Sequence, residues 1–457
     1  MAEDYIPVAG TSDNLETISY INGSAVEVHR EGVFIGDGSN GSNKATVNAY
    51  GALQVSLSDG PFIDAFDRLR VSNPTTVFDS KQIHNDGALF WDDVEVSGGS
   101  TGSTWSQAGA STTLSVGATT AGRRVRQTYR RFNYQPGKSQ LILITGTLGA
   151  SAIGIVRCMG LYDDGNGFFL RDNAGTYQFV RRSSAGSPVT DTAVDQSSWN
   201  IDPFDGTGPS GVTLDFSQAQ ILVLDYEWLG VGRARYGFVV DGIIYYGHQF
   251  LHANTAAGVY MSTPNLPVRY EIENDGTGAA SSLECICSSV MSEGGTQDVG
   301  TSRYHSSGST PIQANSSGTV YAVCGIRLKS ANVDGVIKLS NLSVMCETAD
   351  SFEWLLIFNP TIAGSPQPAW TSLASSVIET SVGEASDPSA STVTGGTQVA
   401  GGHVKSSNST GDISSALDTA LQLGSAIDGT VDELWLCVRP LGANADVYGS
   451  LSWKEIS

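Results

Sequence analysis

Short apolar or alternating runs, separated by Gly, Asn, Asp and Ser, fill almost the whole of this 457-residue chain. Runs of this length with a period of two residues are typical of strands rather than helices. The chain contains 53 glycines, and 40% of its residues are hydrophobic while only 16% are charged, a balance that excludes a mainly disordered polymer. We therefore predict an all-β fold, with one candidate helix at residues 413–423 after a capping Asp412.

The length of the chain requires more than one hydrophobic core. We expect an N-terminal anchoring section at residues 1–75, a central β-sandwich at 76–298, a polar linker at 299–318 and a C-terminal β-sandwich at 319–457. In the central section, the apolar runs 141–144 and 221–224 predict strands that are covered on both faces. The Asp241-Gly242 pair, between two β-branched and aromatic runs, predicts a hairpin with a type I′ turn. Near the end of the chain, Val447, Leu451 and Trp453 fall on one face of a last strand.

The anchoring section contains a short internal repeat, in which residues 47–56 parallel residues 63–72. Each copy reads as an apolar residue, an acid or amide, Ala, an aromatic residue, a turn, and a strand with alternating Leu and Val. A hairpin of this size cannot form a core alone, so it must pack on a neighbour, either the next domain or another subunit. The candidate anchor residues are Phe62, Phe66, Leu69 and Val71.

The second copy contains Asp64-Ala65-Phe66 followed, after Asp67, by Arg68-Leu69-Arg70-Val71-Ser72. This stretch resembles a recurrent one in virion structural proteins of tailed bacteriophages, which commonly have Gly at the position of Asp67. The closing run 444–455 also looks like the end of such proteins.

This resemblance implies a non-enzymatic structural component of a phage particle, either a tail fibre or a head or collar appendage, that assembles through its N-terminal section. It implies other virion proteins as partners, a homo-oligomer with a trimer favoured, and a location in the virion after synthesis in the bacterial cytoplasm. A host surface glycan is a further candidate partner.

The middle of the chain is similar to concanavalin-like and laminin-G-like sandwiches, in residues 225–228 and in the hairpin 236–242. There, one strand ends in an aromatic pair and the next hairpin turns at Asp-Gly. The resemblance implies a jelly-roll-type sandwich of two sheets for the central domain. The calcium and sugar ligands of those families have no match here, so their binding chemistry does not carry over.

The net charge of −21 argues against nucleic acid and anionic membranes as partners. The absence of an apolar run of about 18 residues argues against membrane insertion. The one dense basic patch includes Arg124, Arg126 and Arg130, which would share a strand face. We interpret these arginines either as a dock for an acidic neighbour or glycan phosphates, or as a solvated or intersubunit-paired face.

No motif predicts a catalytic site, a cofactor or a bound metal. The six cysteines fall in strand-like runs without zinc spacing, and Cys285 and Cys287 should lie on one face of a strand. The G-x-S-x-G match at residues 98–102 sits in a Gly, Ser and Thr tract without a following helix, so we interpret it as a loop. The Asp- and Gly-rich stretch 163–167 is interpreted as a hairpin turn, with a loosely held structural ion as the alternative.

Two alternatives stay open. The tryptophans Trp91, Trp105, Trp199 and Trp370 could stack on sugar rings, although core or interface anchoring is more usual. The chain could also be a polysaccharide-degrading tailspike enzyme, which would require two carboxylates roughly 5–10 Å apart in a groove.

Overall fold

The computed structural model describes the backbone of three N-terminal strands and residues 63–456, except 67, 71–73, 187, 349, 365–367, 386–390, 406–408, 412–421 and 443–444. The chain divides into two compact units, Met1–Ser58 and Asp59–Ser457. In the first unit, β1 (Asp4–Pro7), β2 (Asn14–Ile21) and β3 (Glu27–Glu31) form an antiparallel sheet in that order. The repeat copy at 47–56 and nearly all of the candidate helix lie outside the described residues.

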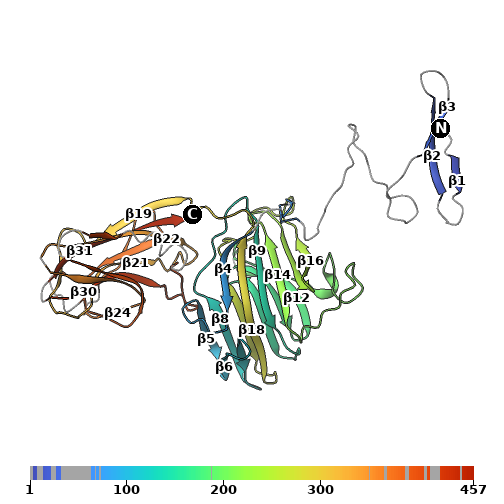
Figure 1. The fold of residues 1–457 in the computed structure, drawn as a ribbon. Helices are drawn as coiled ribbons and strands as arrows, with labels where there is room; N and C mark the ends of the chain where they lie inside the picture. The colour runs from blue at the N-terminus through green and yellow to red at the C-terminus, as the bar shows by residue number, and fades with distance from the viewer. Residues whose placement is uncertain are drawn as a thin grey trace. The chain divides into compact units, whose positions relative to one another are not determined.

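The second unit begins with a sandwich of two antiparallel sheets (Figure 1). Its strands are β4 (Thr75–Lys81), β5 (Trp91–Gly98), β6 (Thr101–Ser106), β7 (Ser111–Val116), β8 (Ala121–Thr128), β9 (Gln140–Thr147), β10 (Ile155–Tyr162), β11 (Gly167–Asn173), β12 (Thr176–Ser183), β13 (Thr190–Asp195), β14 (Gln220–Tyr226), β15 (Ala234–Val240), β16 (Ile243–Phe250), β17 (Val268–Asp275) and β18 (Ser281–Ser292). One sheet has seven strands in the order β13-β12-β11-β10-β17-β8-β5. The other has eight, in the order β16-β15-β14-β9-β18-β7-β6 with β4 beside β18.

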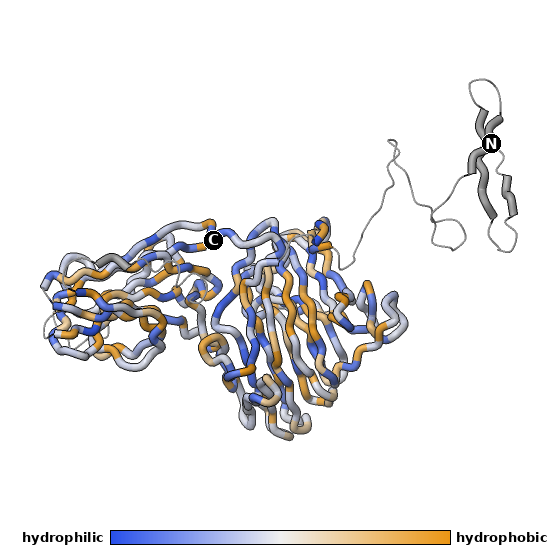
Figure 2. Tube along the Cα trace, viewed as in Figure 1, coloured by the Kyte–Doolittle hydropathy of each residue, from blue (hydrophilic) through white to orange (hydrophobic). Residues whose placement is uncertain are grey.

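The two predicted apolar runs form β9 and β14, adjacent strands in the middle of the eight-stranded sheet. Leu222 and Leu224 point into the large core between the sheets, whereas Val223 lies with Leu141 and Tyr246 in a smaller apolar cluster on the opposite face. Both faces of these strands are therefore covered, as the continuous apolar runs indicated. Figure 2 shows apolar positions, drawn in orange, concentrated along many of these strands.

Residues that adopt positive φ form several of the tight turns between strands of this sandwich. Asp241 and Gly242 connect β15 to β16 with φ of 51° and 81°, and two successive positive φ values identify the predicted type I′ turn. The G-x-S-x-G match forms the tight β5–β6 connection, with Ser100 also at positive φ, and the stretch at 163–167 forms the β10–β11 hairpin. Both are the loops that the sequence predicted.

The C-terminal sandwich contains β19 (Gly300–Ser306), β20 (Ile312–Ala314), β21 (Tyr321–Leu328), β22 (Val336–Cys346), β23 (Phe352–Phe358), β24 (Thr361–Ile362), β25 (Thr371–Ser372), β26 (Ile378–Val382), β27 (Val393–Thr394), β28 (Thr397–Val404), β29 (Ser409–Gly411), β30 (Glu433–Pro440) and β31 (Ala445–Ile456). One sheet has the order β19-β31-β22-β29, with β20 also paired to β31, and the other has the order β25-β26-β21-β30-β23-β28. A separate two-stranded sheet consists of β24 and β27. Residues 299–318, which we expected to be a linker, instead contribute β19 and β20 to this sandwich, because their polar side chains still allow backbone pairing with β31.

A β-bulge changes the expected placement of two cysteines on β18. The register with β9 shifts between Cys285 and Cys287, which turns Cys285 into the core and leaves Cys287 exposed. Our expectation that both lie on one face is therefore wrong. All six cysteines are free thiols. Within the described residues, no helix is long and apolar enough to cross a bilayer.

Candidate functional site

Residues 63–66 and 68–70, which belong to the phage-like stretch, form a closed turn that we call the docking segment. The Asp64 carboxylate accepts hydrogen bonds from the backbone N–H groups of Phe66 and Arg68, at 2.8 and 2.9 Å, and from Arg68 Nε at 2.7 Å. The Asp64 N–H donates in turn to the Arg68 carbonyl at 2.8 Å. An aspartate that bonds its own downstream backbone stabilises a tight turn, so Asp64 explains the turn expected from the repeat.

Two arginines, Arg233 directly before β15 and Arg235 on it, hold the docking segment against the central sandwich. Arg233 Nε donates to the Ala65 carbonyl at 2.7 Å, and another nitrogen of the same guanidinium donates to the Asp64 carbonyl at 3.0 Å. Arg235, on β15, donates to the Ile63 carbonyl at 2.8 Å. The three segment residues are buried. The neighbour on which this small unit packs is therefore the next domain of the same chain.

Arg70 inserts into an acidic socket formed by Asp225 on β14 and by Glu293. Its guanidinium bonds to the Asp225 carboxylate, to Glu293 at 2.5 Å and to the Tyr246 hydroxyl at 3.0 Å. Asp225 is completely buried and also accepts a hydrogen bond from Arg235 at 2.5 Å. Burial opposes the charge of Arg70, but the two carboxylates outweigh this effect and raise its pKa above the ordinary value. Burial and the Asp225 charge raise the pKa of Glu293.

The predicted anchor residues differ in how the structure places them. Phe66 is half-buried and the Arg68 guanidinium lies 4.8 Å from its ring centre. Leu69 bridges to Ile63 through the backbone, but its side chain is 54% exposed. Phe62 and Val71 lie outside the described residues. Anchoring of the described part thus depends mainly on arginines and carbonyls rather than on the apolar side chains that we singled out.

The basic patch is used within the chain. Arg124 Nε donates to Asp93 at 2.7 Å, and Arg126, only 2% exposed, pairs with the same carboxylate at 3.3 Å. Arg130 is buried, donates to Gln422 at 3.1 Å, and has its pKa lowered to about 10 by burial. The three side chains do not form an accessible dock in this geometry, and they lie apart from the docking segment's contacts. Intrachain carboxylates and amides engage all three side chains, and a role for them in partner binding stays a prediction.

Sequence reasoning missed Asp225, Arg233, Arg235 and Glu293. The sequence does contain an indication of this site, because Asp225 directly follows the apolar run of β14 and Arg235 lies among the apolar residues of β15. A charge within a buried strand requires a compensating group nearby. The pairing of Asp225 with Arg235 across two strands supplies one such group, and the docking segment supplies the rest.

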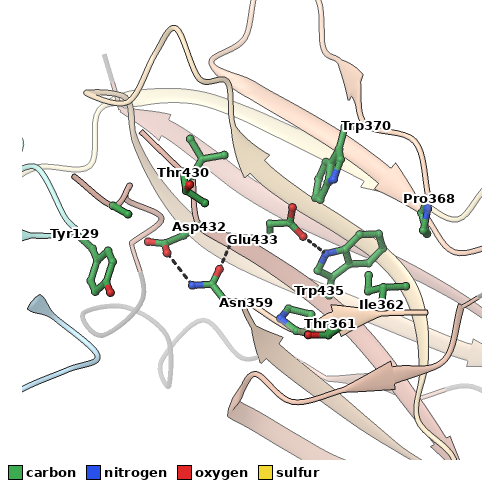
Figure 3. A pocket seen from close by; sticks show the side chains of 13 residues that line it. Tyr129, Asn359, Thr361, Ile362, Pro368, Trp370, Thr430, Asp432, Glu433 and Trp435 are labelled. Atoms are coloured by element: carbon green, nitrogen blue, oxygen red, sulfur yellow. Dashed lines mark hydrogen bonds between the residues drawn. The ribbon is translucent and has the colours of Figure 1, made fainter. Parts of the chain in front are cut away.

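A pocket of about 500 Å³ opens at the C-terminal sandwich, with Tyr129 of the central sandwich also in its lining (Figure 3). We call it the Trp370 pocket. Its lining residues are Tyr129, Asn359, Pro360, Thr361, Ile362, Pro368, Trp370, Ala426, Thr430, Val431, Asp432, Glu433 and Trp435. Of the tryptophans proposed for sugar stacking, Trp370 lines this pocket and is half-buried, whereas Trp91 and Trp199 are 3% and 5% exposed and belong to the central core.

A second, shallower groove of about 520 Å³ lies on the seven-stranded sheet. Glu271 and Glu273 of β17 line it together with Arg123, Arg182 and Asp191. Glu271 accepts two hydrogen bonds from Arg123, at 2.8 and 3.0 Å. Burial, and next the charge of Glu271, raise the pKa of Glu273.

No family model and no curated protein sequence matches this chain. Among solved structures, the chain is similar to the CBM2 module of the evolved Dit of Lactobacillus casei BL23 phage J-1, at 9% identity over 49% of this chain and 98% of that one, with a TM-score of 0.32. It is also similar to a legume lectin-like domain from Entamoeba histolytica, at 10% identity over 48% and 98% of the two chains, with a TM-score of 0.29. A Bacteroides ovatus GH16 protein of a mixed linkage glucan PUL shares 8% identity over 47% and 99%, with a TM-score of 0.30. Likenesses at these values assign no function to this chain.

Proposed function

We propose that this protein is a non-enzymatic structural component of a tailed-phage particle, either a tail fibre or a head or collar appendage. In this proposal the first unit, Met1–Ser58, attaches to other virion proteins, and the docking segment fastens that unit to the central sandwich. The proposal rests on the resemblance of residues 63–72 to virion proteins, and the insertion of Arg70 into the buried acidic socket of Asp225 and Glu293 supports it by fixing this stretch to the central sandwich. The resemblance to virion proteins lies in this same segment.

The contacts of the docking segment suit a mechanical role. Arg233 and Arg235 donate hydrogen bonds to its backbone carbonyls, and its Arg70 guanidinium pairs with two carboxylates. A force that pulls on the chain N-terminal to the segment would therefore be shared by several charge-assisted hydrogen bonds. Such bonds are short and directional, and a segment held in this way transmits force without a large apolar interface. We infer that this is why so short a stretch can serve as an attachment.

Deletion of residues 1–58 tests the attachment. This truncation removes the first unit and keeps the docking segment, whereas deletion of residues 1–75 would also remove Arg70 and the start of β4. We expect the shortened protein to unfold at the wild-type temperature, because both sandwich cores are retained, but to be missing from purified particles. Immunoblots of particles assembled from a phage genome that carries the deletion provide the measurement. Incorporation at the wild-type level would overturn the attachment role of the first unit.

A second candidate function, cleavage of a surface polysaccharide, is favoured by Glu271 and Glu273 in the shallow groove. They lie two residues apart on β17, so both side chains project from the same face of the sheet, as a pair of catalytic carboxylates requires. The raised pKa of Glu273 would suit a general acid. However, Glu271 is held by Arg123 and lies 3.2 Å from Arg269 in a second ion pair, which reduces its ability to activate water. Among the residues that the structure describes, no aromatic side chain lines the groove to hold a sugar ring.

We therefore expect the purified protein to release no reducing ends from host surface polysaccharide above the level of a Glu273→Gln variant. The matched substitution keeps the size and hydrogen-bonding geometry of residue 273 while removing its acid. A reducing-sugar assay over several hours at equal protein concentration makes the comparison. Release by the wild type that Glu273→Gln abolishes would replace the non-enzymatic proposal with a glycosidase.

A further inference from the structure

The Trp370 pocket has one apolar wall, which is held in place by packing against the buried Trp435. The Trp370 ring packs edge-on against Trp435, with ring centres 5.3 Å apart and an interplanar angle of 69°. Trp435 is 1% exposed and its indole lies flat over Gly325, where an added Cβ would come within 2.5 Å of the ring. A glycine at this position on β21 is what allows the indole to lie against the sheet. The half-buried Trp370 thus stands on a rigid base, with part of its surface open to the pocket.

A second wall of the pocket is polar, and hydrogen bonds hold its side chains in place. Asn359 donates from its amide nitrogen to the Asp432 carboxylate at 2.8 Å, and its amide oxygen accepts the backbone N–H of Glu433 at 2.7 Å. The other Asp432 oxygen accepts the Gly424 N–H at 3.0 Å. Figure 3 shows these groups beside Trp435, on the pocket side of the sheet. These oxygens line the same pocket as Trp370, and their hydrogen bonds fix their orientation.

The charge of the lining limits what the pocket can bind. The described residues of the lining include Asp432 and Glu433 but no Lys, Arg or His. Arg327 lies outside the lining, with its guanidinium over one face of the Trp370 ring at 4.4 Å from the ring centre, and it is engaged by Glu379 and Glu433 at 2.9 and 3.1 Å. The opposite face of the indole is the one considered for a ligand. An anionic ligand would meet two carboxylates and, in the described part of the lining, no cation. A neutral ligand that carries many hydroxyl donors would instead find acceptors.

We propose that the Trp370 pocket is a binding site for a neutral hexopyranose unit of a surface polysaccharide. A pyranose presents an apolar face of C–H groups that matches the indole of Trp370, and its rim of hydroxyls matches the carboxylate and amide oxygens. The hydroxyl of Thr361, which has no hydrogen-bond partner among the described residues, adds an adaptable donor and acceptor. The pocket volume lies within the range of about 300–1,000 Å³ that is usual for small-ligand sites. This site goes beyond the structural role proposed above and does not depend on it.

Titration calorimetry with the full-length protein tests the site. The probes are neutral trisaccharides of gluco, galacto and manno configuration, together with a uronic-acid trisaccharide and a lysine-rich peptide as comparators. We expect at least one neutral trisaccharide to bind, and Trp370→Ala to weaken that binding by about tenfold or more, a change of about 1.4 kcal/mol. Thr361→Val should weaken it severalfold, because the isosteric side chain lacks the hydroxyl.

Trp228→Ala is the matched control, since Trp228 is a half-buried tryptophan of the central sandwich that donates to the Met261 carbonyl at 3.1 Å and is not among the candidates for sugar stacking. Its trisaccharide affinity should stay within about twofold of the wild type. If circular dichroism shows that Trp370→Ala is unfolded, the trisaccharide affinities of Trp370→Phe and Thr361→Val are compared with the wild type instead. The site is overturned if no neutral trisaccharide binds, if the pocket variants bind like the control, or if the uronic-acid probe or the peptide binds more tightly. Each of these outcomes leaves the particle-incorporation experiment unaffected.

Discussion

Replacing Asp225 with asparagine is expected to lower the free energy of unfolding by about 3–5 kcal/mol. Asp225 is fully buried and accepts hydrogen bonds from Arg70, Arg235, Tyr246 and Ser139. Asparagine has nearly the same shape but no charge, so the completely buried Arg235 would lose its counter-ion. A buried guanidinium without a counter-ion lowers the free energy of unfolding far more than the loss of one hydrogen bond does.

Chemical denaturation followed by circular dichroism measures this effect, and Asp79→Asn is its control. The Asp79 side chain is 59% exposed and lies 3.7 Å from Lys81, a surface pair that contributes at most about 1 kcal/mol. Limited proteolysis should in addition cut the Asp225→Asn protein within the docking segment, because Arg70 loses the more buried of its two carboxylates. Equal stabilities of the two variants would show that the acidic socket does not hold the segment.

Replacing Trp453 with alanine is expected to cost about 3–5 kcal/mol in the C-terminal sandwich. The Trp453 side chain is fully buried in the core of that sandwich, and its indole N–H donates to Glu455 at 3.2 Å. Alanine would leave a cavity that the close-packed strands cannot collapse to fill, and it would remove a donor from a carboxylate that is 9% exposed. Both effects act in the same direction.

Calorimetry should show the loss as a transition at lower temperature in Trp453→Ala. Because the central sandwich has its own core cluster, we expect its transition to change less. Ser452→Ala is the control, since it alters the adjacent residue on the opposite face of β31, where surface substitutions usually change stability by less than about 0.5 kcal/mol. A Trp453→Ala melting curve that coincides with the control would contradict the placement of Trp453 in the core.

Local patterns were sufficient to predict the strand content and several turns. The alternation of Val447, Leu451 and Trp453 appears as three buried positions on β31, and Asp241-Gly242 forms the expected hairpin. These predictions succeed because the two-residue period and the positive φ of a tight turn are properties of adjacent residues. The same reasoning failed at Cys287, because a bulge depends on how β9 and β18 are paired and leaves no mark within one strand.

The amino-acid sequence by itself determined that the chain forms sheets, that the loops at 98–102 and 163–167 are turns, and that the small motif at residues 63–72 needs a neighbour. Only the tertiary structure decided that this neighbour is the central sandwich, where Arg70 meets Asp225 and Glu293. It likewise brought Asn359, Trp370 and Asp432 into one pocket. Arg70 and Asp225 are 155 residues apart, and no periodicity encodes contacts at such separations. They follow from strand order and register, which the whole chain sets together.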